Sequence, residues 1–171
     1  MAAGKESEHA SMKNRTTVER TSDREVVVRR TINAPVHIVF EAWTRPELFK
    51  RWWVPKSIGI TLLSCDMDVR VGGRYRLAFA HGPAGQMEFF GTYVEVTPPS
   101  RLVWTNDEGG EGGSVTTVTF EQKGDQTLLV VRDLYPSKEA LLASGAMDAM
   151  PETLDQLDEF LAATGASLGR T

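Results

Sequence analysis

The chain has 171 residues, of which 41% are hydrophobic and 25% are charged, and its formal net charge is -4 at pH 7. This length and composition are typical of one globular domain, and the negative charge disfavours nucleic acid and anionic membranes as partners. The single cysteine, Cys65, excludes an internal disulfide, and no apolar run approaches the ~20 residues of a membrane span. We therefore expect a cytoplasmic protein. Its expected oligomeric state is a monomer or a homodimer.

The N-terminal third is expected to contain an arm, one strand and two short helices. Residues 1–24 are polar, carry mixed charge and lack the apolar core of a signal peptide, so they predict a flexible arm. The β-branched run Val26–Ile32 predicts the first strand, and Pro35 suits the first turn of the helix that follows. That helix is predicted for Val36–Trp43, and a Thr-x-x-Glu capping pattern beginning at Thr44 predicts a second short helix.

The middle of the chain is predicted to form an antiparallel sheet. Its extended segments are separated by turns rich in glycine and proline, and short connections of this kind favour antiparallel hairpins. The predicted strands are Ile60–Leu63, Cys65–Val71, Arg74–His81, Met87–Thr97, Leu102–Asn106, Val115–Lys123 and Thr127–Leu134.

Alternation along these segments predicts which face of the sheet is apolar. The side chains assigned to that face are Tyr75, Leu77, Phe79, Leu102, Trp104, Val118, Phe120, Leu129 and Val131. Between Met87 and Val96 the alternation is less clear, because two phenylalanines are adjacent and Gly91 could mark a bulge. The favoured interpretation puts Phe90, Val94 and Val96 inside, with Glu88 on the same side.

An amphipathic helix is predicted near the C-terminus, after a first helical region that Ser137 caps and Gly145 interrupts. Its apolar stripe has helical spacing and consists of Met147, Met150, Leu154, Leu157 and Leu161. Pro151 either lies inside this helix, where it opens space beside Met147 and Met150, or begins the long helix after a separate turn. These elements give an α+β layout with a domain over residues 25–165 and a flexible tail over residues 166–171.

Several ordered motifs resemble one superfamily. The segments that carry the resemblance are Asn33–Trp53, Asp68–Tyr75, Gly91–Trp104 and Thr116–Phe120. They are similar to the START-like, or helix-grip, superfamily, and within it to the family related to the C-terminal domain of the activator of the heat-shock-protein-90 ATPase. The resemblance implies a curved antiparallel sheet wrapped around a long C-terminal helix, with a pocket between them. It implies little shared chemistry.

A small apolar or aromatic molecule is the ligand that this architecture favours, because large and adaptable side chains gather around the expected pocket. The residues predicted to bind it are Trp52, Trp53, Tyr75, Leu77, Phe79, Phe90, Trp104, Met147, Met150 and Leu154. The alternative is a filled core, which is favoured for Trp104, Phe79 and Phe120 and is as plausible as the pocket for the two methionines and the adjacent tryptophans.

Three ionisable residues share the predicted inner face and are candidates for acid–base chemistry. Asp133, Glu88 and His81 could have shifted pKa values in an apolar pocket, or could anchor a hydroxyl or amine of a ligand. His9, His37 and His81 are far apart in the sequence, so no metal site is predicted. No cofactor is expected, because the Gly-rich stretch 109–113 lacks the strand-to-helix context of a phosphate loop.

Three functions therefore remain open at this point. The first is binding of the small molecule, with no catalysis expected. The second, implied by the resemblance, is a module that interacts with a chaperone ATPase in the stress response. The third is a cyclase, dehydratase or hydrolase that acts on a bound aromatic or polyketide-like compound, as the superfamily allows.

Overall fold

The computed structural model describes residues 16–80, 85–107, 113–144 and 146–170. The strands are β1 Thr17–Arg20, β2 Glu25–Ile32, β3 Thr61–Met67, β4 Arg74–Ala80, β5 Gln86–Thr97, β6 Arg101–Thr105, β7 Val115–Lys123 and β8 Gln126–Leu134. The helices are α2 Val36–Thr44, α3 Pro46–Phe49, the short 3-10 helix η1 Lys56–Ile58, α4 Lys138–Ser144 and α5 Ala146–Arg170. None of the described helices combines the length and hydrophobicity that crossing a membrane requires.

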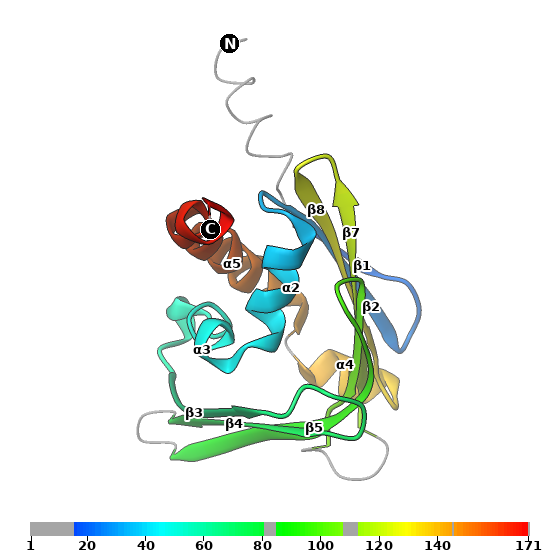
Figure 1. Cartoon of the computed structure of the whole chain (residues 1–171). Helices are drawn as coiled ribbons and strands as arrows, with labels where there is room; N and C mark the ends of the chain where they lie inside the picture. The colour runs from blue at the N-terminus through cyan, green and yellow to red at the C-terminus, as the bar shows by residue number, and fades with distance from the viewer. Residues whose placement is uncertain (1–15, 81–84, 108–112, 145, 171) are drawn as a thin grey trace, which may run out of the picture.

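The strands form one antiparallel sheet in the order β1-β2-β8-β7-β6-β5-β4-β3. Figure 1 shows that this sheet is sharply bent, since β3, β4 and β5 turn away from the direction of β2, β7 and β8. Helices α2, α3 and α5 lie on the concave side of the bend (Figure 1). The predicted α+β, helix-grip architecture is thereby confirmed.

The core lies between the concave face and the helices. All nine side chains that alternation assigned to the inner face are buried, from Tyr75 on β4 to Val131 on β8. Helix α5 contributes Leu154, Leu157 and Leu161, which are almost completely buried, so this part of the predicted stripe packs as expected. A fully buried leucine stabilises the fold by roughly 2 kcal/mol relative to an exposed one.

Strand β5 differs from the favoured interpretation. Phe89 pairs with Leu77 and packs against the core, whereas Phe90 pairs with Arg76 on the opposite face. The bulge lies between Tyr93 and Glu95 and not at Gly91, so the alternation reverses only after Tyr93. Val94, predicted inside, is therefore exposed, while Val96 pairs with the buried Leu102 and packs against the core as predicted.

Secondary structure is present in two segments that were predicted to be flexible. Within the expected arm, Thr17–Arg20 forms strand β1, which pairs with β2. Helix α5 extends to Arg170, so the expected tail is helical up to that residue. Pro151 lies inside α5, which begins at Ala146, so the alternative in which Pro151 starts the helix is wrong. Residue 145 and residues 1–15 lie outside the described part of the chain.

Two helix-start predictions have different outcomes. The Ser137 hydroxyl accepts a hydrogen bond from the Ala140 amide at 3.0 Å, which confirms Ser137 as a cap of α4. The capping box at Thr44 is wrong, because the Thr44 hydroxyl donates back to the Phe40 carbonyl at 2.9 Å. Helix α3 instead begins at Pro46, whose fixed φ suits a first helical position, after Arg45.

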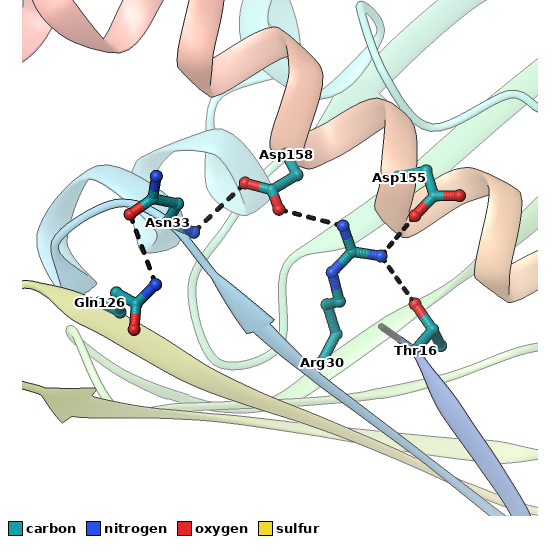
Figure 2. A network of polar contacts seen from close by, with 6 residues as sticks. All are labelled: Thr16, Arg30, Asn33, Gln126, Asp155 and Asp158. Atoms are coloured by element: carbon teal, nitrogen blue, oxygen red, sulfur yellow. Dashed lines mark hydrogen bonds and ion pairs between the residues drawn. The ribbon is translucent and has the colours of Figure 1, made fainter. Parts of the chain in front are cut away.

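A buried arginine attaches α5 to the sheet (Figure 2). Arg30 of β2 has a side chain only 7% exposed, and its guanidinium donates to Asp158 of α5 at 3.0 Å and to the Thr16 hydroxyl at 3.0 Å. It also forms an ion pair with Asp155. Asp158 is 14% exposed and accepts a second hydrogen bond from the Asn33 amide, whereas Asp155 is 59% exposed. Asp158 is therefore the principal counter-charge of this buried cation.

This difference in burial predicts unequal effects of two matched substitutions. Asp158→Asn should lower the free energy of unfolding by about 3 kcal/mol, because it leaves a buried guanidinium without its buried partner. Asp155→Asn removes the same charge from an exposed position and should change the free energy by less than about 1 kcal/mol. Urea unfolding of both variants at pH 7 measures the two values, and equal losses would contradict the assignment.

Candidate functional site

A cavity of about 530 Å³ lies between the bend of the sheet and the first two turns of α5. Strands β4 to β8 and residues next to them, the ends of α2 and α4, and the segment after α3 form the other walls. Its aromatic lining comes from Trp43, Trp53, Phe79, Phe89, Trp104 and Tyr135, and α5 contributes Ala149, Met150 and Thr153. The walls are thus mainly apolar and aromatic, with flexible Met150 on the helix side.

Trp43 is the centre of the aromatic wall. Its ring lies 4.9 Å from Trp52, 5.7 Å from Trp53 and 6.0 Å from Trp104, measured between ring centroids. The Trp43 indole nitrogen has no oxygen or nitrogen acceptor among the described residues, and the rings of Trp52 and Trp53 pack against Trp43 at steep angles. The interlocked rings give this wall a fixed shape.

A smaller pocket of about 40 Å³ adjoins the main cavity. The two spaces share the walls formed by Trp43, Trp53, Phe89, Trp104 and Asn106. Tyr75 and Leu77 line the smaller pocket but not the main cavity. A ligand in the main cavity would therefore reach these two residues only by extending between the shared aromatic rings.

Helix α5 holds the segment that carries Trp53 by hydrogen bonds to its main chain. The Gln156 amide nitrogen donates to the carbonyls of Trp52 at 2.9 Å and Val54 at 2.8 Å. The Gln156 amide oxygen accepts from the Lys56 amide at 2.8 Å. Glu152 accepts hydrogen bonds from the backbone amide and the hydroxyl of Ser57, which lower the pKa of Glu152. This part of the cavity wall is consequently fixed to the helix.

A chain of polar side chains crosses the floor of the cavity. The Tyr75 hydroxyl donates to the Asn106 amide oxygen at 2.7 Å, and the Trp104 indole donates to the same oxygen at 3.2 Å. The Asn106 amide nitrogen donates to the Thr116 hydroxyl at 2.9 Å. Thr116 in turn donates to Asp133 Oδ1 at 2.5 Å. Each polar group in this series of hydrogen bonds is oriented by the one before it, and the series ends at Asp133.

Asp133 is the carboxylate of the cavity. It is partly buried, lines the cavity and forms no ion pair among the described residues. Burial raises the pKa of Asp133 from 3.8 to about 6, against the opposite effect of the Thr116 hydrogen bond. Burial, and secondarily the charge of Asp133, raises the pKa of Tyr135 to about 12, so Tyr135 stays neutral at physiological pH.

The structure brings together only part of the predicted site. The predicted residues that line the main cavity are Trp53, Phe79, Trp104, Met150 and Asp133. Trp52 and Leu154 are instead buried in the core. Their side chains stabilise the walls from behind and do not face the cavity.

Two predicted residues of β5 lie on the wrong face for the site. Phe90 and Glu88 are on the opposite face of the sheet, because the parity of β5 is reversed relative to the prediction. Glu88 forms an ion pair with Arg76 there. His81 and the side chain of Met147 fall outside the described part of the chain.

Trp52 illustrates why the core and the cavity were hard to separate. Its indole donates to the Ala42 carbonyl at 3.0 Å and its side chain is only 1% exposed, whereas its neighbour Trp53 lines the cavity. The roles of Asn106 and Thr116 were not predicted at all. Their contact depends on strand register, which the sequence does not show directly.

No metal site is evident in the part of the chain that the structure describes, since it contains no group of three or more His, Cys, Asp or Glu side chains placed to hold an ion. Cys65 is partly buried and lies 3.5 Å from the Met67 sulfur. Burial raises the pKa of the Cys65 thiol to about 11, which disfavours a reactive thiolate.

Comparison with known proteins connects this geometry to a family. Residues 33–162 match the sequence family described as Activator of Hsp90 ATPase homolog 1-like protein. No curated protein sequence gives a significant match.

Solved structures resemble most of the chain. A protein from Rhodobacter sphaeroides is 22% identical with a TM-score of 0.77, covering 86% of this chain and 98% of that one. Protein Ms6760 from Mycobacterium smegmatis is 25% identical with a TM-score of 0.73, covering 87% and 99%. An AHSA1-like protein from Aeromonas hydrophila is 21% identical with a TM-score of 0.66, covering 82% and 94%. These chains share the fold.

The raised pKa of Asp133 predicts a pH dependence of stability. The unfolded chain releases this proton near pH 3.8, whereas the folded chain keeps it until about pH 6, so folding becomes less favourable as the pH rises through this window. Asp133→Asn keeps an acceptor for Thr116 and cannot ionise. The free energy of unfolding of the variant, relative to wild type, should therefore rise between pH 3.5 and 7.5 by at most about 3 kcal/mol. Urea unfolding across this range measures the difference, and a constant difference would contradict the assignment.

Proposed function

The chain belongs to the Activator of Hsp90 ATPase homolog 1-like family, and we propose that it binds a small apolar or aromatic molecule in the cavity between the sheet and α5. The observation that carries this proposal is the cavity itself. Its volume of about 530 Å³ lies within the range of roughly 300–1,000 Å³ typical of small-molecule sites. Packed protein cores contain few voids larger than a water molecule.

The composition of the walls supports an apolar or aromatic ligand. Large rings from α2, the segment after α3, β4, β5 and β6 meet across one space, and Met150 can change rotamer to fit different shapes. Pro151, next to Met150, cannot donate a hydrogen bond to the Met147 carbonyl, which loosens the backbone of α5 at the level of the cavity.

The same lining favours binding over catalysis. Among the described residues of the cavity wall, only Asp133 and Tyr135 carry groups that titrate, and Tyr135 stays protonated because its pKa is raised to about 12. Acid–base catalysis by Asp133 would need a second group to return the proton, supplied by the ligand or by residues outside the described part. Asp133 is better suited to anchoring a polar group of the ligand.

A ligand that fits should stabilise the chain against heat. At a concentration 100 times its Kd, a bound molecule contributes about 2.7 kcal/mol, which raises the Tm of a protein of this size by roughly 5–10 °C. The measurement is a thermal shift screen with indole, naphthalene and medium-chain aliphatic compounds, followed by titration of tryptophan fluorescence.

Two variants of α5, each with an alanine replaced by phenylalanine, provide the matched control for this screen. Ala149→Phe places a ring in the cavity and should abolish the shift, whereas Ala162→Phe adds the same ring at an exposed position and should preserve it. A shift that survives Ala149→Phe would place the ligand elsewhere. The absence of any shift across the library would count against the proposed function.

The family name makes a chaperone ATPase the alternative partner. The cavity favours the small molecule over this partner, because concave and mainly apolar spaces of this size are typical of small-molecule sites. We therefore expect the purified chain to leave the ATPase rate of Hsp90 unchanged, as measured by phosphate release. Stimulation that persists in the Ala149→Phe variant would favour a chaperone-interacting module over a ligand-binding protein.

A further inference from the structure

We propose that the ligand is a hydrophobic amine that binds as its ammonium ion, with the nitrogen against Asp133 and the aromatic or alkyl body between the rings of the cavity. This inference rests on the function proposed above and specifies the chemical class of its ligand. It depends on the position of one carboxylate relative to the aromatic walls and on the charges that surround it.

The carboxylate and the aromatic wall lie on one row across the sheet. Trp104 of β6 is opposite Thr116 of β7, and Thr116 is opposite Asp133 of β8. Two strand spacings separate Trp104 from Asp133, which corresponds to roughly 10 Å between their backbones. A ring packed beside Trp104 and a short alkyl linker would therefore bring an amine to Asp133.

Asp133 has one oxygen available for a ligand. Oδ1 accepts the hydrogen bond from Thr116, and no described residue donates to Oδ2. The side chain lines the cavity and is partly exposed, so Oδ2 can be reached from the cavity. An ammonium group can donate to Oδ2 and still direct its remaining hydrogens to the hydroxyls of Ser114 and Thr116, which also line the cavity.

The surroundings of Asp133 contain no positive charge that could neutralise it, as far as the structure describes them. Its partner on β2 is Val26 and its partner on β7 is Thr116, while α5 presents Ala149, Met150 and Thr153 to the cavity. On its own strand, Arg132 points to the opposite face by alternation and forms an ion pair with Glu25 at 3.7 Å. A cationic ligand would supply the missing counter-charge.

These features discriminate between polar head groups. A hydroxyl can donate to Asp133 but leaves its charge uncompensated, and a carboxylate would be repelled by it. An ammonium ion forms a charge-assisted hydrogen bond with Asp133. It is also attracted to the faces of tryptophan rings, three of which line the cavity. The site therefore selects the cation.

The test uses three series of compounds, built on indole, on naphthalene and on a decyl chain. Within each series the members differ only in the end group, which is an ammonium, a hydroxyl or a carboxylate. Binding is measured at pH 8 by calorimetry with the full chain. In each series that fits the cavity, the ammonium compound should bind at least about ten times more tightly than the hydroxyl compound. The carboxylate compound should bind most weakly.

Two charge-matched variants assign the preference to one residue. Asp133→Asn should lower the affinity for the ammonium members by about tenfold or more and leave the hydroxyl members nearly unchanged. Glu159→Gln removes one negative charge from an exposed position of α5 and should leave all affinities unchanged. The comparison separates a local contact with Asp133 from a general effect of net charge.

The outcomes distinguish this inference from the function on which it rests. Equal affinities for the ammonium and hydroxyl members, or an ammonium affinity that Asp133→Asn does not change, would overturn the amine as ligand while the binding cavity stands. Ammonium binding that persists in Ala149→Phe would also overturn it, because the site would lie outside the cavity. If no compound of any series binds, both the amine ligand and the proposed binding function are overturned.

Discussion

The attachment of α5 to the concave side of the sheet is the constraint on which the rest of the structure depends. The middle turns of α5 are held by Leu154, Leu157 and Leu161, which are buried, and by the contact of Arg30 with Asp158. Because the sheet is sharply bent, a helix that packs closely on one part of it leaves space beside another part. The cavity lies at the N-terminal end of α5, beside Met150 and Pro151. Helix α5 therefore combines turns that hold the fold together with turns that border the candidate site.

The floor of the cavity shows a balance between stability and binding. Burial of Asp133 disfavours its charged form, and the hydrogen bonds that pass from Asn106 through Thr116 reduce this cost only in part. Val131, two residues earlier on the same face, is apolar and buried and carries no such cost. Functional sites often contain groups that destabilise the fold, and this property of Asp133 supports its assignment to the candidate site.

Most of the fold was predictable because hydrophobic alternation and helical spacing are local properties of the sequence. The inner face from Tyr75 to Val131 and the leucines of α5 follow directly from them. Strand β5 was assigned to the wrong face because its bulge lies after Tyr93, and adjacent Phe89 and Phe90 fit either parity. Residues of the site were predicted where they also formed part of an apolar pattern. The contact between Asn106 and Thr116 was not predicted, because it depends on how separate strands align.

The hydrogen bonds of Gln156 have a consequence for variation among related sequences. Gln156 binds the main chain of Trp52, Val54 and Lys56 and makes none of its hydrogen bonds to their side chains. Substitutions of Trp53 and Val54, whose side chains line the cavity, can therefore alter the shape and chemistry of the wall while the backbone stays attached to α5. Changes of side chain are thus compatible with a fixed backbone in this part of the cavity wall.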